Sequence, residues 1–570
     1  MSKATEIKQA IWLPLVGLLT ILVGAWLAFT VRTSGGISVQ DIRFNGADGT
    51  QMSALLYVPK SATAQTPAPG ILAVHGYINS RETQDGFSIE FARRGYVVLA
   101  LDQTGHGYSK GAAFANGFGG PDGLAYLRSL PMVDKTQIGL EGHSMGGWTV
   151  LAAAAAMPDG YTSMVLEGSS TGKPFAAEGR PTWPRNVALV YSKYDEFGPF
   201  MWGVGRSLDL PNSDKLQTLF GSQEAIKIET MYGSMDEGTA RVLYQPNTTH
   251  PGEHFSTEAI GRAIDWFGKT LDGGTPLPAS NQIWIYKEIG TGIGLIGFVM
   301  LVLGLFNAVL QIPVFGRLKL AAVPARDERD KSYWCAFFVS AFVPVVLFFP
   351  AFIAITAWVP PSVWLPQTVT TQVALWALLC SGFSLLLWRF TASPPKVVAS
   401  PWRLNIASAV ITVVLAYGVL FIVDHLFHID LRFWVVALKV PSAAQWAIAL
   451  IYVVPITLAF LVTMRSLCGD LTVKGDTPLR QYVFAIGALS LGFITMLTLV
   501  YAIFFASGIL ITGFDPLSTV IGLQFVPLLV AIAIIGIFCW RRTGSHRAGA
   551  LIVGMLVTLY VVAGTATQVA

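Results

Sequence analysis

Charged side chains are scarce in this chain of 570 residues, because Asp, Glu, Lys and Arg together make up only 13% of it. Combined with a mean hydropathy of +0.55, so low a charge content excludes a single water-soluble domain. The net charge is only +4, which gives no reason to expect a nucleic-acid partner. A nucleotide-binding motif is also lacking, so nothing in the sequence supports ATP-driven transport or a nucleotide ligand.

Cysteine is rarer still, with four residues in the chain, and none of them falls between residues 31 and 282. A disulfide framework is therefore excluded for that part of the chain. The spacing of the four cysteines matches no metal motif, and we expect them to pack as apolar side chains: Cys335, Cys380, Cys468 and Cys539. We predict no resident metal and no cofactor.

Long apolar runs are abundant instead. The first, Ile11 to Thr30, follows a short leader that carries Lys3 and Lys8. It is long enough to cross a bilayer and lacks a clear small-residue cleavage site, which favours an uncleaved signal anchor in residues 1–30. A cleaved signal peptide is the alternative.

Eight further candidate spans follow residue 282, whereas residues 31–282 have the composition of an ordinary globular domain. The sequence thus predicts three parts: an N-terminal signal-anchor helix (1–30), a globular domain (31–282) and a polytopic membrane domain with about eight helices (283–570). The expected spans are 284–311, 334–358, 368–390, 404–427, 443–466, 481–511, 518–540 and 547–567.

The basic residues in the loops predict which side of the membrane each part occupies. Short loops expected outside hold only Arg432 and Lys439, while those expected inside are richer in basic residues, among them Arg317, Arg326, Arg403, Arg480, Arg541 and Arg542. This asymmetry predicts a cell-membrane protein of about nine spans, with a cytoplasmic N-terminus and an extracytoplasmic 31–282 domain.

Within residues 31–282, apolar strand-like runs alternate with helix-like segments. The runs Gly70–Val74 and Tyr96–Leu101 are continuously apolar, as is typical of strands buried on both faces of a sheet. A helix-like segment, Phe87 to Arg94, lies between them. This alternation predicts an α/β fold with a mostly parallel sheet and flanking helices.

One short motif carries chemistry. Gly142-His143-Ser144-Met145-Gly146-Gly147 follows a strand-like run and leads directly into an alanine-rich helix, Trp148 to Met157. Strand, Gly-x-Ser-x-Gly and helix form the context of a nucleophile elbow, in which a tight turn presents the serine hydroxyl. We therefore expect Ser144 to be a nucleophile, with the Met145 backbone N–H directed at the developing oxyanion.

Together with His75-Gly76 and the sequence Asp102-Gln103-Thr104-Gly105-His106-Gly107, this elbow resembles the α/β-hydrolase superfamily over about residues 38–270. Dienelactone-hydrolase-like and prolyl-peptidase-like serine hydrolases are the most similar branches. The resemblance implies an α/β-hydrolase domain inserted between an N-terminal transmembrane helix and an eight-helix C-terminal transmembrane region. The membrane half resembles no family.

The order of catalytic residues in that superfamily is nucleophile, acid, base. Asp195 takes the first carboxylate position after the strand-like run Asn186–Tyr191, so it is the expected acid. A solvated loop acid is the alternative role for Asp195. Its neighbour Glu196 is expected to point away from the site.

Two histidines are candidates for the base, in the loop between the last strand and the final helix (Thr257 to Thr270). His250 lies five residues beyond the strand, at the expected distance for reaching Ser144, and is preferred. His254 is the alternative base, although it adjoins the helix and suits a cap or a pocket wall.

The resemblance further implies an oxyanion hole formed by the backbone N–H groups of Tyr77 and Met145. It also implies that His75, His106 and His143 stabilise turns rather than bind a metal.

Three further segments leave alternatives open. The aromatic run Phe197–Gly203 predicts either a lid or acyl-chain pocket, or local packing of an insertion. The cluster Asp424–Asp430 contains two histidines and suits either a metal or proton relay, or simply a helix end. Gly290–Gly297 has the letters of a phosphate loop, but close helix packing explains it better.

These observations predict a membrane-bound, extracytoplasmic serine hydrolase, of the esterase or lipase type, acting through a Ser-His-Asp triad and an acyl-enzyme. A small-molecule, lipid or acylated substrate would suit a site held near a lipid bilayer. Alternatives are a serine peptidase with the same triad, or a transporter or signalling protein whose hydrolase-like domain binds a ligand. The oligomeric state is left open.

Overall fold

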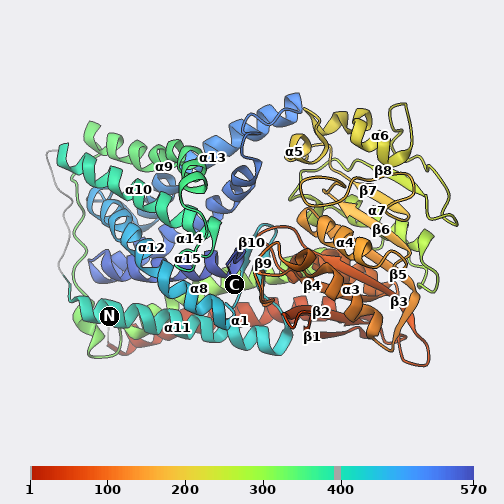
Figure 1. Ribbon diagram of the computed structural model, residues 1–570. Coiled ribbons are helices and arrows are strands. Elements are labelled where there is room, and N and C mark those ends of the chain that lie inside the picture. The colour runs from red at the N-terminus through yellow and green to blue at the C-terminus, as the bar shows by residue number, and fades with distance from the viewer. Residues whose placement is uncertain (1–2, 391–399, 570) are drawn as a thin grey trace. The chain divides into compact units, whose positions relative to one another are not determined.

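The computed structural model describes residues 3–390 and 400–569. Residues 1–2, 391–399 and 570, which fall in the predicted anchor and membrane domain, lie outside the described residues. The chain divides into two compact units (Figure 1). The helical unit comprises residues 1–25, 290–499 and 517–563, and the α/β unit comprises residues 26–289, 500–516 and 564–570.

The α/β unit is built on an eight-stranded sheet in the order β1-β2-β4-β3-β5-β6-β7-β8. Only the pairings of β1 with β2 and of β2 with β4 are antiparallel, and all the others are parallel. The strands are β1 (Ser38–Asn45), β2 (Gln51–Val58), β3 (Ala68–Val74), β4 (Val97–Asp102), β5 (Val133–His143), β6 (Ser163–Glu167), β7 (Val187–Val190) and β8 (Arg241–Tyr244).

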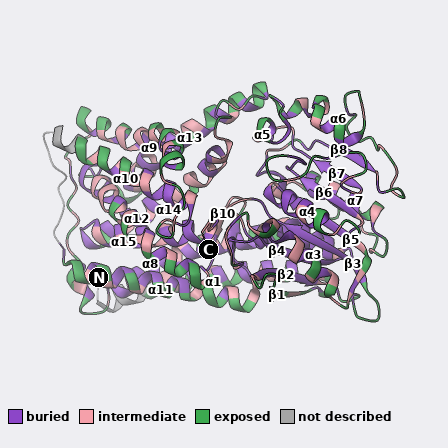
Figure 2. Cartoon of the chain, viewed as in Figure 1, coloured by how far each residue is buried: buried purple, intermediate pink, exposed green. Residues whose placement is uncertain are grey.

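Helices cover both faces of this sheet, which explains why its inner strands are continuously apolar. Apolar side chains of α3 (Gly120–Ser129) and α4 (Met145–Ala156) share one core with the sheet, and those of α2 (Asp85–Arg93) and α7 (Thr257–Thr270) share another. Every residue of β3 to β8 outside the start of β5 is buried, as Figure 2 shows in purple. Because β3 to β8 run parallel, their carboxyl ends lie at the same edge of the sheet. In folds of this kind the catalytic loops lie at that edge.

Two connections differ from a plain α/β layout. No regular helix lies between β6 and β7 in the described chain. The longer connection from β7 to β8 contains α5 (Gly198–Trp202), the 3₁₀ helix η4 (Ser207–Asn212) and α6 (Asp214–Phe220).

Among the described residues, nine helices are long and apolar enough to cross a membrane. They are α1 (Lys3–Arg32), α8 (Trp284–Val309), α9 (Lys331–Trp358), α10 (Thr368–Phe390), α11 (Trp402–Phe427), α12 (Ala443–Asp470), α13 (Pro478–Ser507), α14 (Pro516–Thr543) and α15 (Arg547–Gly564). The predicted fold class, an α/β-hydrolase domain between one N-terminal and eight C-terminal apolar helices, is confirmed.

Glycines set the packing of α1 against α8 within the helical unit. A Cβ atom added to Gly24 would overlap the Gly290 carbonyl oxygen, and one added to Gly297 would lie 2.8 Å from the backbone nitrogen of Ile21. Added Cβ atoms on Gly17 would likewise meet the α8 backbone. The glycine-rich run at 290–297 therefore serves close helix approach.

Within the α/β unit, a fully buried charge network joins the end of α1 to the first turn of α8. Arg32 donates to the Tyr57 hydroxyl at 2.9 Å, and Lys287 pairs with Asp85 at 2.8 Å. Burial alone would raise the pKa of Asp85, but the charges of Arg32 and Lys287 hold it below its usual value. Because each charge has a partner, the network ties the end of α1 and the first turn of α8 to the same part of the α/β unit.

Candidate active site

Ser144 occupies the tight turn between β5 and α4. Its φ of 56° and ψ of −121° lie in a region that residues other than glycine rarely adopt. The flanking glycines make the turn sterically feasible: a Cβ on Gly142 would overlap the Gly146 carbonyl oxygen, and one on Gly146 would overlap that of Val74. This strained geometry is that of a nucleophile elbow.

Backbone hydrogen bonds hold the elbow at the edge of the sheet. The Ser144 N–H donates to the Glu167 carbonyl of β6 at 2.8 Å, and the Gly147 N–H donates to the Ser144 carbonyl at 2.9 Å. Met145 is the first residue of α4, so its own N–H has no partner within the helix. That N–H is available to a ligand at the serine.

The structure places Asp195 and His250 in direct contact. Asp195 follows β7 and His250 follows β8, and Oδ2 of the first lies 2.7 Å from Nδ1 of the second. The Phe197 N–H donates to the other carboxylate oxygen at 2.7 Å, which fixes the plane of the Asp195 carboxylate. Nε2 is the imidazole nitrogen that the bond to Asp195 leaves unused.

Burial acts on both members of this pair. It raises the pKa of Asp195 to about 8, against the lowering effect of the Phe197 N–H, and it lowers the pKa of His250 to about 3. Both shifts have the same cause, since a site shielded from water disfavours the charged form of either group. A neutral imidazole is the form that can accept a proton from a serine.

His254, the alternative base, lies elsewhere in the loop. Its ring centroid is 4.0 Å from that of His143 and 6.1 Å from that of Phe87. The structure pairs Asp195 with His250, at 2.7 Å between Oδ2 and Nδ1. The geometry thus favours His250 over His254.

Within the described chain, the Ser144 hydroxyl makes no hydrogen bond. The bond between a serine and its base is often long or misaligned without substrate, so its absence here does not separate Ser144 from His250 functionally. The two residues share neighbours: a Cβ added at Gly76 would lie 3.1 Å from the Ser144 Cβ and 3.3 Å from His143 Nδ1, and the rings of His143 and His250 are 4.6 Å apart.

Tyr77 follows β3 in the turn that passes beside Ser144. His75, at the end of the strand, directs its Nδ1 to the Gly76 carbonyl at 2.7 Å, and the Gln103 N–H donates to its Nε2 at 3.2 Å. One ring nitrogen of His75 bonds the turn after β3 and the other bonds the turn after β4, which agrees with a structural role. The Tyr77 and Met145 N–H groups come from the two turns that flank the serine.

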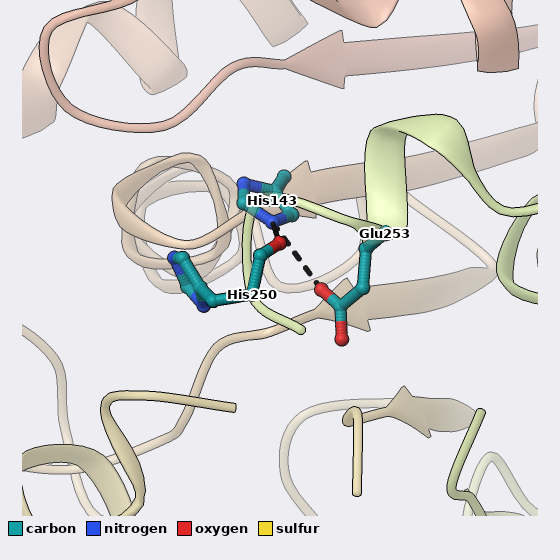
Figure 3. A group of neighbouring side chains, drawn as sticks. All are labelled: His143, His250 and Glu253. Atoms are coloured by element: carbon teal, nitrogen blue, oxygen red, sulfur yellow. Dashed lines mark hydrogen bonds and ion pairs between the residues drawn. The ribbon is translucent and has the colours of Figure 1, made fainter. Parts of the chain in front are cut away.

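Figure 3 shows His143, His250 and Glu253, whose ligand atoms lie within 4.8 Å of one another. Each of the three residues already has hydrogen-bond partners. His143 Nε2 lies 3.1 Å from the His250 carbonyl oxygen and 3.2 Å from Glu253 Oε2, and Glu253 Oε1 accepts from the N–H and hydroxyl of Ser192 at 2.9 and 2.7 Å. The group therefore ties the elbow to the loops that carry the acid and the base.

Further buried carboxylates lie at the ends of the neighbouring strands. Burial raises the pKa of Glu141 to about 8 and that of Glu253 to about 7, and it raises the pKa of Glu167 as well. Gln84 donates to both carboxylate oxygens of Glu141, at 2.8 and 2.9 Å. The sequence motifs give no signal for this cluster, which forms only when β5, β6 and the base loop are assembled.

Glu196 differs from expectation. Its side chain does not point away, but is 1% exposed and accepts the His250 N–H at Oε2, 2.9 Å away. Its Oε1 accepts the hydroxyl of Tyr501 at 2.7 Å. The reason is that the loop after β7 runs beside the loop after β8, with the Tyr194 N–H donating to the Thr248 carbonyl at 3.1 Å.

A segment far along the chain also reaches the site. The Gln568 amide donates to the Tyr77 hydroxyl at 3.0 Å, and Thr567 exchanges backbone hydrogen bonds of 2.8 Å with Gly105 and Ala113. Like Tyr501, these residues belong to the α/β unit although they follow spans of the membrane half. Sequence reasoning had no means to find them.

An aromatic patch extends from the elbow, formed by Trp148, Phe114, Phe175 and Phe200. Trp148, in the first turn of α4, lies 4.8 Å from Phe175 and 6.0 Å from Phe200 between ring centroids, and Phe114 stacks on Phe175 at 5.6 Å. The three phenylalanines are 40%, 40% and 51% exposed. Met201 and Trp202 are buried in the core, so the run at 197–203 serves packing, with Phe200 alone turned to the patch.

The sheet order and the strained serine between β5 and α4 define an α/β hydrolase. Residues 69–194 match the model of the alpha/beta hydrolase fold family, and this region of the chain belongs to the α/β-hydrolase superfamily.

Several named proteins are similar to this region. A monoacylglycerol lipase of Mycolicibacterium smegmatis is 29% identical over 133 residues, which make up 22% of this chain and 45% of the lipase, less than half of its length. Among solved structures, an esterase of Pyrococcus furiosus has 17% identity and a TM-score of 0.30, covering 41% of this chain and 94% of the esterase. A dienelactone hydrolase of Anabaena variabilis has 17% identity and a TM-score of 0.29, covering 41% and 99%.

Proposed function

We propose that this chain is a membrane-bound serine hydrolase that cleaves carboxylic esters, with Ser144 as nucleophile, His250 as base and Asp195 as acid. The observation that carries the proposal is the 2.7 Å bond between Asp195 Oδ2 and His250 Nδ1, beside a serine held at φ 56°. A nucleophile, a base within the same loop cluster and a carboxylate that orients the base are what acyl transfer requires.

In this mechanism His250 Nε2 takes the Ser144 proton while Oγ attacks the ester carbonyl. The Met145 and Tyr77 N–H groups stabilise the oxyanion, and His250 passes the proton to the departing alcohol. Water then attacks the acyl-enzyme with His250 again as base, which releases the acid and restores the Ser144 hydroxyl. Asp195 holds the Nδ1–H tautomer throughout.

The aromatic patch supports an apolar acyl or alcohol group in the substrate. Exposed Phe114, Phe175 and Phe200 offer apolar surface beside the elbow, where a hydrocarbon chain would be removed from water. The name of the similar monoacylglycerol lipase agrees with a lipid or other acylated substrate. A serine peptidase with the same triad is the second candidate, and the patch argues against it because it offers no charged group to a peptide terminus.

We further propose three domains: a signal-anchor helix (1–30), an extracytoplasmic hydrolase domain (31–282) and a polytopic membrane domain (283–570) in the cell membrane, with a cytoplasmic N-terminus. The basic residues of the expected inner loops support this orientation. Protease cleavage of the hydrolase domain in intact cells is its test, and protection of that domain would reverse the orientation.

Labelling with a fluorophosphonate probe tests the catalytic assignment. We expect the purified wild type to be labelled, Ser144→Ala and His250→Ala to lose labelling by about 10³-fold or more, and His254→Ala to keep it. Labelling lost in His254→Ala but kept in His250→Ala would exchange the two histidines.

No labelling of a folded wild type would refute the enzyme assignment and favour a ligand-binding domain of a transporter or signalling protein.

A comparison of the hydrolysis rates of p-nitrophenyl esters and peptide p-nitroanilides separates esterase from peptidase. We expect Phe200→Ser to raise KM for a long acyl chain more than for acetate, since only the long chain reaches the patch.

A further inference from the structure

The last turns of α13 belong to the α/β unit and lie against the loop that carries the acid. Residues 500–516 are part of this unit. The ring of Tyr194, one residue before Asp195, meets Phe504 and Phe505 edge to face, with centroids 5.9 and 5.1 Å apart. Such contacts stabilise the loop against the helix.

A carboxylate bridges this helix to the base. Glu196 accepts the Tyr501 hydroxyl at Oε1, 2.7 Å away, and the His250 N–H at Oε2, 2.9 Å away. The carboxylate is almost fully buried, so water does not replace a lost partner. The backbone N–H of His250 is thereby held by a second carboxylate, in addition to the imidazole bond to Asp195.

The position of this backbone decides the reach of the imidazole. Nδ1 is fixed by Asp195, so a shift of the His250 backbone swings Nε2 relative to Ser144. Proton transfer needs the two heavy atoms within hydrogen-bond distance, and a displacement of roughly 1 Å can reduce a rate about 10²-fold. A hydroxyl that fixes Glu196 therefore acts on the rate without touching the substrate.

We propose that Tyr501 is a positioning residue for the catalytic base, acting through Glu196 on the His250 backbone. The inference rests on the proposed role of His250. It makes the end of a membrane-span helix part of the support of the hydrolase site, although 305 residues separate the two partners of the hydrogen bond.

The test uses the full-length protein and p-nitrophenyl butyrate. Tyr501→Phe removes one hydroxyl and keeps the ring, so we expect kcat to fall about tenfold with KM unchanged, because the lost bond aligns the base and does not bind substrate. Tyr482→Phe makes the same change earlier in α13 and should leave kcat at the wild-type value. A Tyr501→Phe enzyme with wild-type kcat, or with a changed KM alone, would overturn the inference.

A double-mutant cycle separates positioning from general loosening. Glu196→Ala should lower kcat at least as much as Tyr501→Phe, and Glu196→Gln, which keeps an oxygen acceptor, should recover part of the loss. In the Glu196→Ala background, Tyr501→Phe should have no further effect. If the double variant instead lowered kcat by the product of the two single factors, Tyr501 would act independently of Glu196 and the proposed route would be refuted.

The outcome for the proposed function is read separately. If fluorophosphonate labels Ser144 in the wild type but Tyr501→Phe reacts at the same rate, the hydrolase assignment stands and the positioning role falls. If the folded wild type is not labelled at all, both fall together.

Discussion

The loops after β7 and β8 in the α/β unit and the pair α1 and α8 in the helical unit are held together in different ways. In the α/β unit, ionisable side chains are buried beyond the strand ends and hydrogen-bonded, as Asp195 is to His250 Nδ1 and Glu196 to the His250 backbone N–H. In the helical unit, α1 and α8 approach through Gly24, Gly290 and Gly297, where side chains are missing. The proposed site in the first unit is therefore held by buried hydrogen bonds, whereas the close approach of α1 and α8 in the second depends on glycines.

The largest expected effect tests the chemical side of this contrast. Asp195→Asn should lower kcat by about 10³- to 10⁴-fold, because an amide no longer holds the Nδ1–H tautomer of His250, although its oxygen still accepts the Phe197 N–H. Kinetics on p-nitrophenyl butyrate measure it. Asp209→Asn, a change at an exposed carboxylate, is the control, and a loss below tenfold would remove Asp195 from the triad.

A smaller effect is expected from the packing side. Gly24→Val would drive a side chain into the Gly290 carbonyl, separating α1 from α8 at a cost of about 1–3 kcal/mol. The thermal unfolding midpoint should fall, while the labelling rate of Ser144 in the folded fraction stays unchanged. Gly418→Val, at a glycine with open space around it, should leave the midpoint within error. Equal losses for the two variants would contradict a packing role for Gly24.

The smallest effect concerns the buried acids. Burial raises the pKa of Glu141 to about 8 in the folded state, so between its ordinary pKa of 4.5 and pH 8 the unfolded chain releases a proton that the folded chain retains. Stability therefore falls as the pH rises through this window. Glu141→Gln should raise the unfolding free energy at pH 8 and leave it unchanged at pH 4.

Thermal midpoints at the two pH values measure this difference. Glu237→Gln, at an exposed acid, is the matched control and should show no dependence on pH. A Glu141→Gln midpoint below that of the wild type at pH 8 would mean that the carboxylate is ionised and stabilising in the fold.

Much of the fold followed from local pattern. The continuous apolar runs predicted β3 and β4, and helix α7 begins and ends where the sequence predicts it, at Thr257 and Thr270. The spans were predictable because a bilayer needs a long apolar helix whatever its neighbours are. Short α3, α5 and α6 were not predicted, since tertiary packing rather than local periodicity stabilises so few turns.

Site residues were predictable only where a local motif marks a strained turn, or where the order of residues along the chain matches that of the superfamily. Ser144 is marked by Gly142 and Gly146, which its turn requires on steric grounds. The bond from Tyr501 to Glu196 and that from Gln568 to Tyr77 have no local signal, because partners 305 and 491 residues apart meet only after the fold is complete. A nucleophile can be found from its own turn, but its supports come from elsewhere in the chain.

The backbone pairing of Thr567 with Gly105 and Ala113 has a consequence for biosynthesis. A ribosome makes the strands, the elbow and the loops that carry Asp195 and His250 long before it reaches residue 567. During that interval the Tyr77 side chain lacks the hydrogen bond that Gln568 donates to it. The hydrogen bond at Tyr77 can therefore form only after α15 has been translated.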